Sequence, residues 1–203
     1  AGIGETSGAQ AVEGGRPPEL PPGLFFSIWS VIFLLYTVFA VLAVTTPHYL
    51  ERHLSIPLLA AGTGNVVWML AAQFLGNDAL NLILIVPILL FAWEASHRVH
   101  RMGGFDGTWR RLNAAALTGL LSGWATVALS ISLPRVVRHL RGLGPTDDVW
   151  ISLWIALLTA GLLTWVYAVR VRRGLFFFVA LSWCLAGVPA HPLYGTGMGW
   201  LPA

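Results

Sequence analysis

The feature that most constrains this chain is an uncharged stretch near its N-terminus. Residues 24–46, LFFSIWSVIFLLYTVFAVLAVTT, hold 23 consecutive positions without a formal charge. A helix needs about 20 apolar residues to cross a hydrocarbon layer about 30 Å thick. Only 10% of all residues are charged and the mean hydropathy is +0.71, whereas an ordinary soluble domain carries about 25% charged residues. We therefore expect a membrane protein.

Further apolar segments follow this first one. They cover residues 55–76, 79–98, 112–133, 149–169 and 174–190. The last is at the lower length limit for a span, so we expect five to six spans. Lipid offers the backbone no hydrogen-bond partner, and no segment shows the alternation of a barrel strand, so each should be helical. The predicted fold class is an all-α, polytopic transmembrane helix bundle over residues 21–190, with a polar tail at 1–20 and a C-terminal tail at 191–203.

The arginines predict how the bundle is oriented. All 12 basic residues are arginine. With six spans, eight arginines fall on one side, and four fall on the other, namely Arg16, Arg135, Arg138 and Arg141. The arginine-rich side should face the cytoplasm, matrix or stroma, with both termini opposite. A net charge of +3 is too small and too scattered to indicate nucleic-acid binding.

The opening ELPPGLFFSIW combines two prolines with three aromatic rings. Pro21 and Pro22 fix φ and lack a backbone N–H, which suits a helix start, where the first N–H groups have no partner within the helix. One interpretation is an ordinary helix start at the membrane interface, with Trp29 as a packing residue. The other is a rigid opening that holds aromatic rings over a cavity.

Polar and aromatic side chains inside the apolar segments are candidates for ligand binding. Asn65 and Gln73 are eight residues apart, about 80° on a helix, so both can face the bundle interior. They either bridge neighbouring helices or line a cavity. Trp124 is the one large side chain on a segment of small residues, where it fills a hole or stacks on a ligand. The ten tryptophans could sandwich a flat apolar ligand or simply pack and anchor the chain.

Other motifs give weaker signals. Leu163, Tyr167 and Arg170 satisfy a loose sterol-binding pattern that has many chance matches. The sequence has no P-loop, no HExxH, no cysteine metal cluster and no Ser-His-Asp spacing, so we expect a non-enzymatic protein. Its one cysteine, Cys184, lies in an apolar run and should behave as a small hydrophobic residue.

Taken in order, four segments resemble the TspO/translocator family, also called tryptophan-rich sensory proteins. PPGLFFSIWSVIFLLY is similar to the proline-led first helix of the family, and NVVWMLAAQFLGNDAL to its N-x-x-W second helix. FAWEASHRVHR resembles the third helix with its basic turn, and LLSGWATVALSISL resembles the fourth. The resemblance covers about residues 19–190.

The resemblance implies a TspO-like bundle that binds a flat apolar ligand in an aromatic-lined cavity. The implied cofactor is a porphyrin, haem or chlorophyll-type tetrapyrrole, with a bound lipid or sterol as another option, in a protein that is often a homodimer. The implied site residues are Pro21, Pro22, Phe25, Trp29, Asn65, Trp68 and Trp124.

Departures from the family pattern support an alternative function. The fourth segment has Leu120 and Leu121 where the family has Pro-Tyr, serines replace a later asparagine, and the first loop, PHYLERHLS, is short. A recruited TspO-like fold could instead serve as an accessory subunit of a respiratory or photosynthetic complex, contacting lipids, pigments or neighbouring subunits. The chain begins AGIGETSGAQ, which we interpret as a tail exposed by processing or trimming. We expect an organellar membrane, either the plastid thylakoid or the mitochondrial inner membrane, with a bacterial plasma membrane as the alternative.

Overall fold

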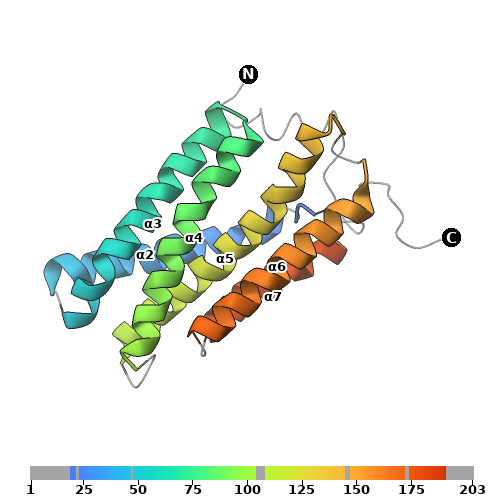
Figure 1. Ribbon diagram of the computed structural model, residues 1–203. Coiled ribbons are helices and arrows are strands. Elements are labelled where there is room, and N and C mark those ends of the chain that lie inside the picture. Colours follow the sequence, from blue (N-terminus) through green and yellow to red (C-terminus); the bar gives the residue numbers. More distant parts are fainter. Residues whose placement is uncertain are drawn as a thin grey trace.

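A computed structural model of the chain describes residues 19–21, 23–46, 48–103, 108–144, 147–171 and 174–190. These ranges form a helical bundle without strands (Figure 1), which confirms the predicted fold class. A short 3-10 helix, η1 (Gly23–Ser27), leads into the first α-helix. The α-helices are α2 (Ile28–Thr45), α3 (Tyr49–Phe74), α4 (Asp78–Arg101), α5 (Trp109–Leu140), α6 (Val149–Val171) and α7 (Leu175–Ala190).

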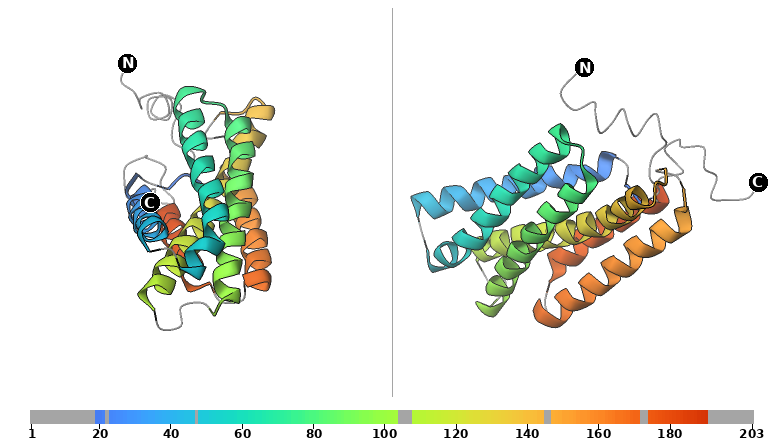
Figure 2. Two further views of the ribbon diagram at one scale, coloured as in Figure 1. Left: turned by 90° about the vertical axis from the view of Figure 1, so that its left-hand side faces the viewer. Right: turned by 45° about the horizontal axis from the view of Figure 1, so that its top comes forward.

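Helix α5 is the centre of the bundle. Figure 2 shows α2 and α7 on one side of it, and α3, α4 and α6 on the other. In its most apolar 18-residue window, 89% of the positions are buried, against 6% for α6. Its small residues permit this position, because they let transmembrane backbones approach closely. A Cβ added to Gly123 would lie 2.5 Å from the carbonyl oxygen of Phe177, so α7 is seated directly on the α5 backbone.

Five helices, α2 to α6, are long and apolar enough to cross a membrane. The sixth segment forms α7, a helix of 16 residues packed against α5, about 24 Å long at 1.5 Å per residue. Helix α3 begins at Tyr49, earlier than the apolar pattern indicated, because its first turn is stabilised by Glu51. That carboxylate accepts from the His48 backbone N–H at 3.1 Å and from Arg110 at 3.1 Å. The loop between α2 and α3 is therefore shorter than the stretch PHYLERHLS that the sequence indicated.

The arginines on the arginine-poor side are used in tertiary contacts. The ion pairs there are Arg135–Asp78 at 2.7 Å, Arg138–Glu19, and Arg141–Asp148 at 3.6 Å. Within the described ranges, Arg52, Arg101, Arg111 and Arg170 at the other end have no such partner. Arg98 and Arg110 at that end pair with Glu94 and Glu51, so ion pairs occur at both ends of the bundle.

Candidate functional site

Three of the predicted site residues form one aromatic cluster between α2, α3 and α5. The ring of Trp29 lies 6.5 Å from that of Trp68, at an interplanar angle of 28°, and 5.7 Å from that of Trp124, at 73°. Phe26 meets Trp124 edge-on at 5.2 Å, and Phe33 stacks on Trp29 at 5.3 Å. Separations of 4.5–7 Å are those of interacting aromatic pairs. We call these five residues the aromatic cluster.

Asn65 lies on the same face of α3 as Trp68. The two are three residues apart, and Asn65 is only 5% exposed, so it faces the bundle interior. Gln73 does not face the bundle interior, because its side chain lies on an exposed face of the helix. The expectation that both amides face inward is therefore correct for Asn65 and wrong for Gln73.

Phe25 and Pro21 point away from the aromatic cluster and toward α7. Phe25 lies 5.1 Å from the ring of Trp183, whose indole N–H donates to the Phe25 carbonyl at 2.9 Å. A Cβ at Gly187 would lie 2.7 Å from the Cβ of Pro21. Phe25 therefore lies apart from Phe26 and Trp29, because consecutive residues in η1 point in different directions. Pro22 lies outside the described residues.

Two indole groups of the aromatic cluster are buried without a hydrogen-bond partner. Trp68 Nε1 and Trp124 Nε1 have no acceptor in the described part of the chain. Outside the cluster, the Trp93 indole N–H donates to the hydroxyl of Thr126 at 3.4 Å, and the Trp183 indole N–H donates to the Phe25 carbonyl. A buried Trp N–H usually finds a partner, and one left unsatisfied is costly. The cluster therefore contains two donors that a ligand acceptor could satisfy.

A buried ion pair attaches the N-terminal segment to the far end of α5. Arg138 is 4% exposed and Glu19 is 1% exposed. Both terminal nitrogens of the Arg138 guanidinium, Nη1 and Nη2, donate to the Glu19 carboxylate. Arg138 Nη1 also donates to the Ser152 hydroxyl on α6 at 2.6 Å. Glu19, which the sequence analysis assigned to the polar tail, is thus part of the bundle. No local signal could have shown this, because its partner is 119 residues away.

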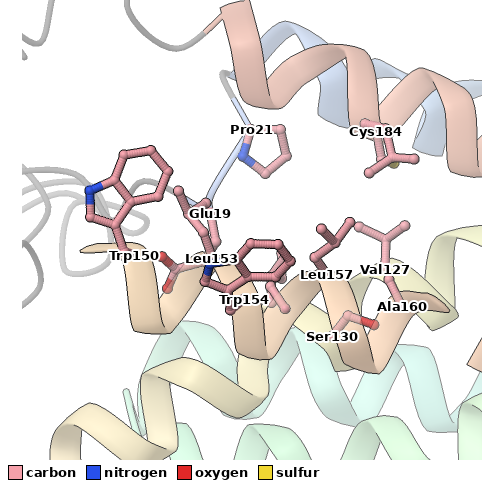
Figure 3. Close-up of a pocket in the computed structure, with 13 residues that line it drawn as sticks. Glu19, Pro21, Val127, Ser130, Trp150, Leu153, Trp154, Leu157, Ala160 and Cys184 are labelled. Atoms are coloured by element: carbon pink, nitrogen blue, oxygen red, sulfur yellow. The ribbon is translucent and has the colours of Figure 1, made fainter. Parts of the chain in front are cut away.

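A cavity of about 500 Å³ lies next to this ion pair, between α5, α6 and α7 (Figure 3). Pro21 is the one predicted site residue that lines it, and none of the cluster tryptophans does. Its other walls include Ser130 on α5, Leu157 on α6 and Cys184 on α7. Sequence reasoning missed this cavity, because its lining residues look like ordinary membrane-helix positions.

Tyr167 of the sterol-binding pattern is not available at the lipid surface. It is 1% exposed, its hydroxyl is 2.6 Å from that of Ser96 on α4, and its ring stacks on Phe177 at 3.8 Å. A Cβ at Gly174 would lie 2.6 Å from that ring, so the α6–α7 turn also closes over it. The tyrosine therefore holds α6 to α4 and α7, and the geometry does not support a surface sterol site at this pattern.

Comparison with known proteins gives one match. A family model described as TSPO-like protein matches residues 18–192. No curated protein and no solved structure matches the chain. The family match covers most of the sequence, including the aromatic cluster and the cavity-lining helices.

Proposed function

Because the chain belongs to the TSPO-like protein family, we propose that this integral, multi-pass membrane protein binds a flat apolar ligand at the aromatic cluster. A tetrapyrrole, such as a porphyrin, haem or chlorophyll-type pigment, is the first candidate ligand, and a sterol is the second. The role is binding rather than catalysis.

The observation that carries this proposal is the pair of unpartnered indole N–H groups. Trp68 and Trp124 belong to different helices, and both rings pack on Trp29. A ligand with a carbonyl, carboxylate or hydroxyl oxygen would supply the missing acceptor, while its flat body would stack on the indole faces. An entirely hydrocarbon ligand would leave both donors unsatisfied.

Binding requires the rings of Trp29 and Trp68 to separate. A flat ligand between two rings needs about 3.5 Å on each side, and the Trp29 and Trp68 centroids are 6.5 Å apart. Trp29 lies near the start of α2, whose span is only 17% buried in its most apolar window. We therefore assign the movement to the first turns of α2, while Trp124 on α5 stays fixed.

The experiment is a titration of the purified protein with protoporphyrin IX, followed by tryptophan quenching and the shift of the porphyrin absorption band. Trp68→Phe keeps an aromatic ring and removes the N–H, so we expect about fivefold weaker binding, from the loss of about 1 kcal/mol. Trp165→Phe is the control, because Trp165 is 64% exposed on α6. Equal affinities for the two variants would refute the proposed hydrogen bond from the Trp68 indole N–H to the ligand.

A second candidate function is that of an accessory subunit in a larger respiratory or photosynthetic complex. The observation that favours it is the exposed face of α6, where Trp150, Trp154 and Trp165 are 67%, 57% and 64% exposed. Their spacing places them within about 60° on the helix. Extraction in a mild detergent, followed by size separation, tests this function. Co-migration with a large complex would support it, and a monomer or homodimer would argue against it.

The organellar membrane, the homodimer and the contacts with lipids or neighbouring subunits remain predictions from the sequence. The same size separation addresses the oligomeric state, and an absorption spectrum of each fraction would show a co-purifying tetrapyrrole by its strong near-ultraviolet band.

A further inference from the structure

We propose that the cavity between α5, α6 and α7 is a second binding site, which takes the hydrocarbon chain and hydroxyl of a neutral long-chain alcohol from the bilayer. Its volume of about 500 Å³ is within the roughly 300–1,000 Å³ of small-molecule sites. It lies apart from the aromatic cluster, since neither Trp29, Trp68 nor Trp124 lines it.

The lining of the cavity is suited to a hydrocarbon chain. Val127 on α5, Leu157 on α6 and Leu185 on α7 contribute apolar walls, and Ala156 and Ala160 leave room between them. Burying a chain against such walls is favourable in proportion to the apolar area covered. Figure 3 shows Leu157 and Val127 across the open space from Pro21 and Cys184.

The hydroxyl of Ser130 is one of the polar groups in the wall of the cavity. Ser130 is 1% exposed, and its Oγ donates its hydrogen to the Thr126 carbonyl at 2.7 Å. The hydroxyl hydrogen is therefore already used, and the oxygen can only accept a further hydrogen bond. A ligand that donates an O–H fits this group, whereas an ester or ketone would have to use another donor of the wall, such as the indole N–H of Trp154.

The charges at the cavity disfavour an anion. Glu19 is the one charged residue that lines the cavity. Its carboxylate already accepts from both terminal nitrogens of Arg138, and Arg138 also bonds Ser152. A fatty acid would meet a carboxylate without a free cation, and burying an unpaired charge costs several kcal/mol. The ligand should therefore be uncharged.

The cavity is reached from the lipid side. Trp154 and Leu157 are 57% and 53% exposed, and Leu185 is 42% exposed, so the residues at its mouth are also lipid-facing residues. Helix α6 is the least buried of the spans. A bilayer-dissolved alcohol can enter between α6 and α7 without passing through water.

The experiment uses the full chain in phosphatidylcholine nanodiscs and hexadecanol that carries a photoreactive diazirine in its chain. After illumination, labelled peptides are identified and quantified by mass spectrometry. We expect saturable labelling of the segments 153–160 and 184–185, reduced by excess hexadecanol. Hexadecanoic acid with the same diazirine, used above its pKa, should label these segments about tenfold less. Equal labelling by acid and alcohol would overturn the selection for a neutral ligand.

Matched variants separate binding from lipid contact. Ala156→Phe fills the cavity, so labelling there should fall about tenfold. Leu158→Phe adds the same ring on α6 at a position that is 66% exposed and does not line the cavity, so its labelling should be unchanged. Labelling that is uniform over exposed helix faces, or that survives Ala156→Phe, would overturn the proposal. Trp68→Phe should leave this labelling intact, so failure at one site is distinguishable from failure at the other.

Discussion

The aromatic cluster and the cavity are built on the same helix, α5, and differ in how space is used. In the aromatic cluster, neighbouring rings lie 5.2–6.5 Å apart, and Trp124 is 3% exposed. In the cavity, small residues such as Ser130 and Ala160 leave about 500 Å³ between helices. The cluster tryptophans are thus in contact with one another, so a ligand that binds there must separate them, whereas the cavity is already open.

The largest expected effect tests this difference in packing directly. Trp124→Ala removes a buried indole from a filled region and should lower the free energy of unfolding by about 3–5 kcal/mol. Ala156→Phe adds a ring to an open region and should change it by less than about 1 kcal/mol, because overpacking costs arise only where space is already filled. Chemical unfolding in detergent measures both values. Similar losses in the two variants would show that the regions are packed alike.

A somewhat smaller effect is expected for the buried ion pair beside the cavity. Glu19→Gln leaves Arg138 without its counter-charge and should lower the free energy of unfolding by about 2–3 kcal/mol. Arg141→Met breaks an exposed pair and should cost less than about 1 kcal/mol. In the Glu19→Gln protein, Arg138 is free to attract an anion. Labelling of the cavity by hexadecanoic acid should therefore rise, and an unchanged preference for the alcohol would contradict this role of Glu19.

The smallest effects come from two tyrosine hydroxyls, each on a helix that contributes to one region: Tyr36 on α2 of the aromatic cluster and Tyr167 on α6 of the cavity. Tyr36 donates to the Leu58 carbonyl at 3.2 Å and joins α2 to α3, while Tyr167 bonds Ser96 and joins α6 to α4. Tyr36→Phe and Tyr167→Phe should each lower the free energy of unfolding by about 1 kcal/mol. Tyr36→Phe should change porphyrin affinity alone, and Tyr167→Phe should change hexadecanol labelling alone. A cross-effect of either variant would show that the two regions are coupled through α5.

Part of the candidate site could be predicted from the sequence because helical spacing is regular. Asn65 and Trp68 share a face of α3, and the family-like segments brought Trp29 and Trp124 to the same cluster. Phe25 lies outside the cluster, since it belongs to η1, a 3-10 helix whose residues rotate differently from those of an α-helix. The expectation of an inward-facing amide is wrong for Gln73, because a position 80° away on a helix can already lie outside the buried face.

The remaining features depend on contacts between distant segments. The pairing of Glu19 with Arg138 joins residues 119 positions apart, and neither residue carries a local mark of burial. The position of α7 depends on Gly119 and Gly123, whose missing side chains admit the backbone at Phe176 and Phe177. The sequence shows that α5 has glycines at these positions, but it does not show which helix packs against them.

The sequence by itself determined that this chain crosses a membrane as a bundle of helices. Lipid accepts only backbones whose hydrogen bonds are satisfied internally, and uncharged runs of sufficient length meet that condition locally. Only the tertiary structure decided where the bundle is filled and where it is open. A cavity is the volume that remains after side chains from α5, α6 and α7 have packed, so it depends on all of them together and on no single segment.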